Sequence, residues 1–131
     1  MGARTVLFAA VAASAAGCAA HFNSTAQVDG VAFSPISCTS GQRAGFPGLE
    51  FVGGTGERLR VLQQLDGNGS IAYFPAGSLV GEMVNACASI DVRSGVGVIN
   101  GVRNLEGTVT FACQTGRQHR ITGALEFANC H

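Results

Sequence analysis

The feature that most constrains this chain is an alternation of apolar and polar residues near its C-terminus. Apolar side chains recur at every second position through most of residues 105–113, and again through 121–127. A period of two is that of a β-strand with one face turned towards a core. Directly paired residues of antiparallel strands point to the same face, so we expect the two runs to form a hairpin whose apolar faces coincide.

The turn of this hairpin is predicted by the same rule. A two-residue loop would set a charged residue against the apolar face. A three-residue loop at 114–116 pairs Val109 with Ile121 and puts a glycine at the third loop position, where a positive φ favours it. In the same register Gly107 faces Gly123. We therefore predict the three-residue loop, and we interpret the two facing glycines as a point where another sheet comes close.

The rest of the chain consists of short apolar runs separated by glycine, proline and asparagine. Nineteen of the 131 residues are glycine and only 12% are charged, which disfavours long amphipathic helices. This spacing predicts an all-β fold, a small antiparallel sandwich or a partly open barrel. A short helix near 79–88 competes with a strand there, because Leu79, Met83 and Ala86 recur at helical spacing. The expected strands are 31–38, 49–52, 58–65, 70–74, 78–84, 88–93, 96–99, 105–113 and 117–127.

The N-terminal segment has the pattern of an export signal. Arg4 precedes an apolar run of about 12 residues, which is shorter than the ~20-residue helix needed to span a bilayer. The run ends in Ser14-Ala15-Ala16-Gly17-Cys18, which resembles the lipobox of bacterial lipoprotein signal peptides. That resemblance implies that Cys18 is lipidated and becomes the new N-terminus. Ordinary cleavage after Ala20, which would give a secreted protein, is the alternative.

This interpretation divides the chain into three segments. Residues 1–17 are expected to be a lipoprotein signal peptide, and residues 28–131 a disulfide-stapled β domain. Residues 18–27 are expected to be a lipidated tether, because they are small and polar and show no periodicity. The protein would then lie at a cell membrane or envelope surface, held there by its lipid.

Four further cysteines lie in the domain, at positions 38, 87, 113 and 130. They include no closely spaced pair of the kind that binds zinc, and four cysteines in an exported chain indicate two disulfides. Cys113 adjoins the predicted turn, whereas Cys130 lies far along the next strand, beyond the ~7 Å that a disulfide permits between Cα atoms. This argument disfavours a Cys113–Cys130 bridge, and a Cys38–Cys87 bridge with it. Of the two remaining connectivities we favour Cys38–Cys130 with Cys87–Cys113, because the first bridge would join the start of the domain to its end.

From Cys38 to Cys130 the chain resembles the small surface lipoprotein antigens of mycobacteria. The points of similarity are the lipobox around Cys18, the polar segment after it, Ser37-Cys38-Thr39, glycine-rich strands, Ile121-Thr122-Gly123-Ala124 and a cysteine near the C-terminus. The resemblance implies a body disulfide between Cys38 and Cys130, envelope anchoring and surface recognition. It implies no catalytic residues. Cys87 and Cys113 lie outside the family pattern.

Composition and motifs argue against several kinds of active site. The chain has no lysine, which excludes a Walker A lysine and a Schiff-base lysine, and its eight scattered arginines form no basic patch for nucleic acid. The glycine-rich stretch 53–58 and the acidic stretch 66–70 lack the later residues of a phosphate loop and of a calcium loop, so we interpret both as turns. We expect His119 to be packed and partly exposed near Phe111. No catalytic residue, metal or cofactor is predicted.

These observations favour a non-enzymatic envelope lipoprotein that displays its β domain for surface recognition or ligand holding, with an unidentified protein or lipid as partner. Two alternatives remain. An inhibitor of a secreted hydrolase would present the loop 41–48, in which Arg43 and Phe46 are candidate recognition residues. A lipid-carrying domain would need an interior cavity.

Overall fold

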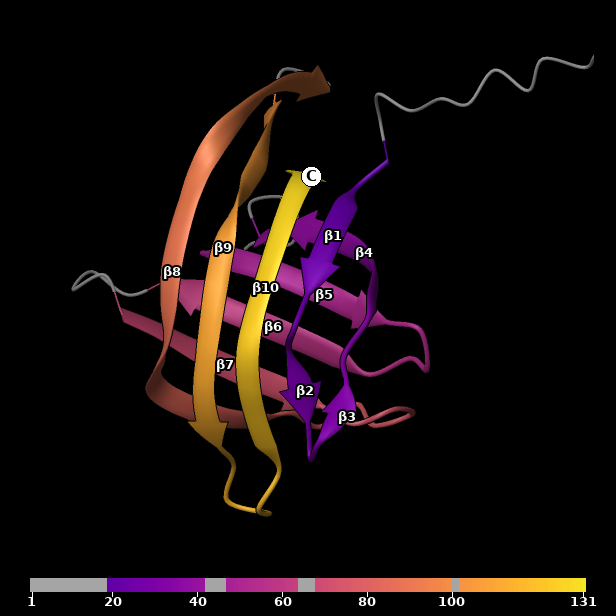
Figure 1. Cartoon of the computed structure of the whole chain (residues 1–131), viewed down its shortest axis with the longest axis vertical. Helices are drawn as coiled ribbons and strands as arrows, with labels where there is room; N and C mark the ends of the chain where they lie inside the picture. The colour runs from indigo at the N-terminus through magenta and orange to yellow at the C-terminus, as the bar shows by residue number, and fades with distance from the viewer. Residues whose placement is uncertain (1–18, 42–46, 64–67, 100–101) are drawn as a thin grey trace, which may run out of the picture.

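The computed structural model describes residues 19–41, 47–63, 68–99 and 102–131 (Figure 1). These residues fold into an all-β structure, which confirms the predicted class. Within these ranges, no helix is long and apolar enough to cross a membrane. The strands are β1 (His21–Ser24), β2 (Gln27–Val28), β3 (Val31–Ala32), β4 (Pro35–Ser40), β5 (Gly48–Gly53), β6 (Arg58–Gln63), β7 (Asn68–Phe74), β8 (Glu82–Ile99), β9 (Val102–Gln114) and β10 (Arg120–Cys130).

The strands form one antiparallel sheet that curls into a half-barrel. From β4 to β10 each strand pairs with the next one along the chain, and β10 then pairs with β1 and β2. In Figure 1, β8, β9, β10 and β1 form one layer, and β5, β6 and β7 cross behind it as a second layer. β8 passes from one layer to the other, because it pairs with β7 near its start and with β9 along the rest of its length.

The hydrophobic core lies between the two layers. Alternate side chains of β5 and β6 point inward, as the period of two predicts for strands with one buried face. Phe51 of β5 packs edge-on against Phe127 of β10, with the ring centroids 5.4 Å apart. The side chains with no exposed surface are Phe51, Leu59, Val61, Ile71, Val109, Ile121, Leu125 and Cys130.

The hairpin of β9 and β10 forms, but the predicted register is wrong. Val109 pairs with Leu125 rather than with Ile121, which pairs with Cys113. The loop keeps three residues but lies two positions later, at 116–118, and its residue of positive φ is Gln118 (65°) rather than a glycine. Because the slip is an even number of residues, the predicted apolar face of each strand still points inward.

Side-chain hydrogen bonds account for this shift. The hydroxyl of Thr115 accepts a hydrogen bond from the backbone N–H of His119 at 3.1 Å. The carboxylate of Glu82, at the start of β8, accepts one from the backbone N–H of Arg117 at 2.9 Å. The second bond comes from a distant segment, so the hairpin sequence alone does not predict it.

The two inward glycines of the hairpin do not face each other. Gly123 pairs with Phe111, and a Cβ at Gly123 would collide with the carbonyl group of Thr25, between β1 and β2. A Cβ at Gly107 would collide with the backbone of Asp91 in β8. Each glycine therefore lets a neighbouring segment of the same sheet come close, and the predicted approach of another sheet at this point is wrong.

The short helix considered near 79–88 does not form. β8 begins at Glu82, and Leu79 and Val80 lie in the exposed connection before it. β7 and β9 supply hydrogen-bond partners on both sides of β8, and this pairing outweighs the helical spacing of the apolar residues. At Ala86, where φ is 54°, the pairing with β7 shifts and the strand bulges.

The expected tether at 18–27 is also wrong for the residues that the structure describes. Residues 21–24 form β1 and pair with β10, and β2 begins at Gln27. The polar composition of this segment reflects the outward face of β1, because the alternate side chains of His21 and Asn23 are exposed. Phe22 points the other way and contacts Phe51, with the ring centroids 6.3 Å apart.

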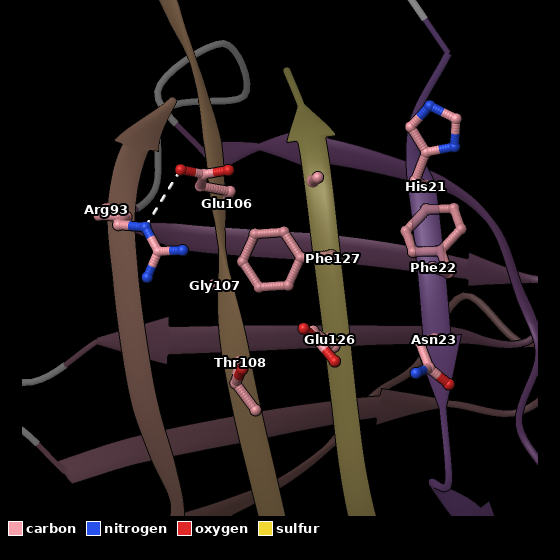
Figure 2. Close-up of a pocket in the computed structure, with 10 residues that line it drawn as sticks. His21, Phe22, Asn23, Arg93, Glu106, Gly107, Thr108, Glu126 and Phe127 are labelled. Atoms are coloured by element: carbon pink, nitrogen blue, oxygen red, sulfur yellow. Dashed lines mark hydrogen bonds and ion pairs between the residues drawn. The ribbon is translucent and has the colours of Figure 1, made fainter. Parts of the chain in front are cut away.

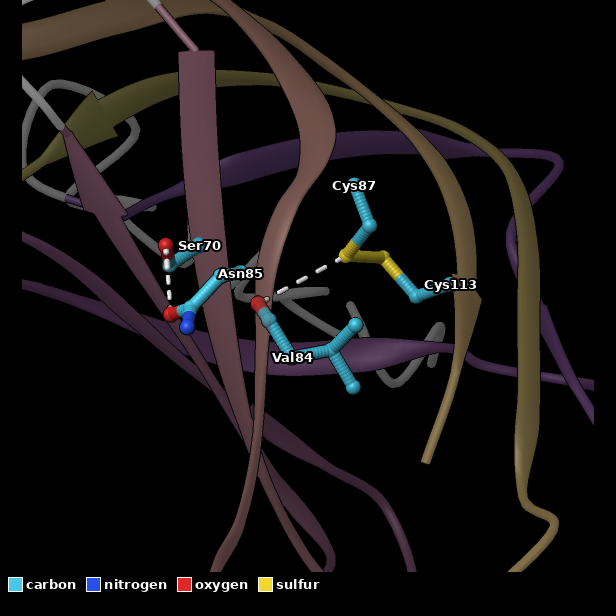
Figure 3. The surroundings of a disulfide bond; sticks show 5 residues. All are labelled: Ser70, Val84, Asn85, Cys87 and Cys113. Atoms are coloured by element: carbon cyan, nitrogen blue, oxygen red, sulfur yellow. Dashed lines mark hydrogen bonds between the residues drawn. A yellow bond between two sulfur atoms is a disulfide. The ribbon is translucent and has the colours of Figure 1, made fainter. Parts of the chain in front are cut away.

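Both favoured disulfides are present. Cys38–Cys130 joins β4 to β10, with the Cα atoms 5.0 Å apart and a sequence separation of 92. β4 is the last strand at one edge of the sheet, so this bridge closes the curled sheet across its open seam. Cys87–Cys113 joins the neighbouring strands β8 and β9 with a Cα separation of 5.1 Å (Figure 3). It lies beside the bulge at Ala86, which turns Cys87 towards Cys113.

Candidate functional site

Four chain segments meet at one end of the half-barrel. We call it the distal end, because it lies opposite the start of β1 and the C-terminus (Figure 1). Hydrogen bonds hold these segments to their surroundings at this end: Glu82, at the start of β8, accepts from the backbone N–H of Arg117 at 2.9 Å, and Asp29 accepts from the N–H of Arg120 at 2.8 Å. Gly54 donates its backbone N–H to the carbonyl oxygen of Ser34, which follows β3. The four segments are the β2–β3 turn (29–30), the β5–β6 turn (54–57), the β7–β8 connection (75–81) and the β9–β10 turn (116–118).

A polar cluster centred on His119 holds this end together. Nδ1 of His119 lies 2.7 Å from Oδ2 of Asp29, and Nε2 lies 3.9 Å from Oε2 of Glu82. Tyr73 packs edge-on against the imidazole, with the ring centroids 5.1 Å apart. Oε2 of Glu82 is buried and has no hydrogen-bond partner among the described residues. The cluster thus links the β2–β3 turn, β7 and the start of β8 to the residue before β10 through one histidine, which is half-buried, as predicted.

The charge state of Asp29 follows from its hydrogen bonds. The bond to His119 and the backbone N–H of Arg120 lower the pKa of Asp29 below its usual value of 3.8. A charged carboxylate only accepts hydrogen bonds, so Nδ1 of His119 is the donor. In an acyl-transfer triad the other nitrogen would face a nucleophile, whereas here it faces Glu82. This geometry positions the loops and does not activate a hydroxyl or thiol.

Beside the cluster lies a pocket of about 240 Å³, which we call the Tyr73 pocket. Asp29 and Glu57 line it together with Tyr73, which is only 7% exposed. Burial raises the pKa of Tyr73 above its usual value of 10.0, and the negative charges of Glu57, Asp29 and Glu82 raise it further. The remaining walls are mostly apolar and come from Val28, Val31, Ala32, Phe33 and Ala76.

Exposed apolar side chains surround this end of the molecule. Val31 is 70% exposed, and Leu79 and Val80 in the β7–β8 connection are 90% and 72% exposed. Ile36, which lies near Gly54 of the β5–β6 turn, is also mostly exposed. Single exposed apolar residues are common, but several around one polar pocket are typical of a binding surface.

Two other hollows lie away from the distal end. A shallow groove of about 310 Å³ runs between β1, β10, β9 and β8 near the start of β1 and the end of β10 (Figure 2). Arg93 and Glu106 form an ion pair at its margin, with 3.1 Å between Nε and Oε1. The second hollow, of about 320 Å³, opens between the two layers and is lined largely by apolar side chains, among them Leu49, Val61 and Leu105.

The site residues predicted from the sequence have different outcomes. Cys18, Arg43 and Phe46 lie outside the described residues, as does part of the acidic stretch 66–70. The four cysteines are paired as favoured. Residues 54–57 form the expected turn between β5 and β6, and Glu57 within it faces the Tyr73 pocket. Within the described ranges, no group of three or more potential metal-binding side chains is present.

Sequence reasoning missed the carboxylates around His119. Asp29 is 90 residues away in sequence, and Glu82 and Tyr73 come from two further strands. The one available signal was the sequence Asp29-Gly30, which is typical of a tight turn between two strands. That signal locates a turn but not the histidine that the turn meets.

Comparison of the chain with protein-family models, with curated proteins and with solved structures found no match in any of the three.

Proposed function

We propose that this protein is a non-enzymatic lipoprotein of the cell envelope, anchored through Cys18, whose distal end recognises a protein partner. The observation that carries the proposal is the exposed apolar surface of Val31, Leu79 and Val80 at the end of the molecule farthest from the start of β1. β1 begins at His21, three residues after Cys18. A lipid at Cys18 would therefore direct the distal end away from the membrane.

The rigidity of the scaffold supports recognition. The Cys38–Cys130 bridge closes the seam, and Cys87–Cys113 fixes β8 against β9. The His119 cluster then ties the distal turns to one another. Surfaces that are already ordered lose little conformational entropy on binding, which favours affinity.

A second candidate function is the holding of a lipid or another apolar ligand. The hollow between the layers supports it, because Leu49, Val61 and Leu105 line a volume of about 320 Å³. Inhibition of a secreted hydrolase remains a prediction from Arg43 and Phe46 alone. The exposed apolar residues of the distal end favour recognition over both alternatives, since neither explains them.

Replacing Cys18 tests the anchor. The full-length wild-type protein should partition with membranes, resist washing with high salt and enter solution only with detergent, because two or more acyl chains bind a bilayer stably. Cys18→Ser removes the thiol to which the lipid is attached, and it should leave an unprocessed precursor. Soluble wild-type protein that begins at His21 would overturn the anchor.

Photocrosslinking in the producing cell tests recognition. A photoreactive residue in place of Leu79 should give a discrete adduct with a second protein. The matched control is the same residue in place of Thr110, which is exposed on the outer face of β9. Absence of an adduct at position 79, or equal adducts at both positions, would overturn the assignment of the distal end.

A further inference from the structure

We propose that the Tyr73 pocket binds a basic side chain, arginine or lysine, of the partner protein. This inference rests on the proposed function and specifies the chemistry of its binding surface. It combines three features of one pocket: two carboxylates, the accessible hydroxyl of a largely buried tyrosine, and an apolar wall.

The two carboxylates leave capacity for a cation. Asp29 bonds to His119 and to the backbone N–H of Arg120, and Glu57 accepts from the hydroxyl of Thr55. Among the described residues, no arginine side chain pairs with Asp29 or Glu57. Each ionised carboxylate has about four acceptor positions, so both can accept further N–H donors. The five N–H groups of a guanidinium suit two carboxylates on neighbouring turns.

The hydroxyl of Tyr73 provides an independent observation. The residue is 93% buried, since only 7% of it is exposed, and it lines the pocket. Its hydroxyl makes no hydrogen bond to any residue in the described ranges, and it is accessible to solvent rather than sealed in the core. The hydroxyl therefore offers an oxygen acceptor to a ligand in the pocket and has no partner within the described part of the protein. A cationic group in the pocket would supply one, and it would relieve the negative field that Asp29, Glu57 and Glu82 impose on Tyr73.

The apolar wall decides between a basic side chain and a simple inorganic cation. Val28, Val31 and Phe33 line the pocket on the side of β2 and β3. Arginine and lysine carry three or four methylene groups below their charge, and these groups pack on apolar surfaces while the charge stays solvated. A volume of about 240 Å³ can hold one such side chain.

The surroundings indicate that the basic side chain belongs to a protein rather than to a free amine. The exposed side chains of Leu79 and Val80 lie outside the pocket itself and would remain exposed around a small ligand. A protein surface would cover them. Interfaces commonly bury a central arginine within a less critical apolar surround, which is the arrangement that the distal end would accept.

The only tyrosine of the chain gives the experiment its signal. The sequence has one tyrosine and no tryptophan, so the intrinsic fluorescence of the protein comes mainly from Tyr73. The full-length protein, purified in detergent, is titrated with N-acetyl-arginine amide as the probe. The matched control is N-acetyl-citrulline amide, which has nearly the same shape without the charge, with sodium chloride added to equal ionic strength.

We expect the fluorescence of Tyr73 to change in a saturable way with the arginine probe. The citrulline probe should bind at least ~10-fold more weakly, because charge-assisted hydrogen bonds are lost. Glu57→Gln should also weaken binding of the arginine probe, whereas Glu126→Gln, on the exposed outer face of β10, should leave it unchanged. Circular dichroism of each variant checks that the fold is retained.

The outcomes separate this inference from the proposed function. A saturable response that discriminates between the two probes and depends on Glu57 supports the basic side chain. An equal response to both probes, or none, overturns it. If the adduct at position 79 still forms in that case, recognition by the distal end stands and only the chemistry assigned to the Tyr73 pocket is wrong.

Discussion

The two ends of the half-barrel are held closed by different means. Near the start of β1 and the C-terminus, the buried Cys38–Cys130 bridge joins β4, the last strand at one edge of the sheet, to β10. At the distal end, the hydrogen bond between Asp29 and His119 and the one that Glu82 accepts from the backbone N–H of Arg117 hold exposed or half-buried turns together. The disulfide is insensitive to pH and is broken by reductant. The polar cluster depends on pH and is insensitive to reductant. A closure that only has to resist opening can be a buried disulfide. A surface that is to bind a partner needs accessible polar groups instead.

Removal of the seam disulfide should have the largest effect on stability. The variant Cys38→Ser/Cys130→Ser releases a loop of 92 residues, so the free energy of unfolding should fall by about 4.6 kcal/mol on the loop-entropy model. Urea denaturation followed by circular dichroism measures this loss. A decrease below about 1 kcal/mol would show that hydrogen bonds close the seam without the bridge.

Removal of the other disulfide should cost less. Cys87→Ser/Cys113→Ser releases a loop of 26 residues, for which the same model gives about 3.5 kcal/mol. β8 and β9 also stay paired from Ala88 to Ile99, on the C-terminal side of the bulge, through their backbone hydrogen bonds. The same denaturation experiment ranks the two bridges. The opposite ranking would contradict the interpretation of Cys38–Cys130 as the main closure.

Substitution of Gly123, which lies between the two ends, tests the close packing of β1 and β2 on β10. Gly123→Ala should lower the free energy of unfolding by about 1–3 kcal/mol, because φ is +94° and the new Cβ would collide with the carbonyl group of Thr25. Gly116→Ala is the control, since nothing lies within 4 Å of its Cβ position. Thermal unfolding compares the two variants. Equal stability of both would contradict the register of β1 and β2 on β10.

The polar closure should show the smallest effect, and one that depends on pH. The folded state lowers the pKa of Asp29 below 3.8, so its charged form stabilises the fold above that pH. This stabilisation is lost as the pH falls through the folded-state pKa. Asp29→Asn should therefore have a lower melting temperature than wild type at neutral pH, and the difference should vanish in acid. Asp91→Asn, exposed on β8, serves as control. A difference that persists in acid would assign the effect to packing.

The fold could be predicted from local pattern because its strands obey a simple period. The alternation around Val109 and Leu125 identified the inward faces of β9 and β10, and those faces are correct despite the shifted register. Reach along a straight strand argued against a Cys113–Cys130 bridge, and Cys38–Cys130 was then favoured because it would join the start of the domain to its end. The inward faces and the reach depend on geometry within one element, which a sequence carries in full.

The errors arise where distant segments determine the local structure. Glu82 fixes the turn at Arg117, and Thr25 approaches Gly123, from parts of the chain far away in sequence. Segment 21–24 appeared structureless because an edge strand needs few apolar residues of its own. The candidate site was missed for the same reason. His119 and Asp29 are distant in sequence, and they come into contact only in the folded, curled sheet.

The pairing of β1 with β10 has a mechanical consequence. If the lipid holds Cys18 while a partner pulls on the distal end, the tension enters the domain along β1. His21 to Ser24 are paired side by side with Ala128 to Leu125, and hydrogen bonds between antiparallel strands run across the strand direction. Force along β1 therefore loads these bonds together in shear, instead of opening them one after another. A lipid at Cys18 would thus attach the domain at a strand whose pairing resists being pulled along its length.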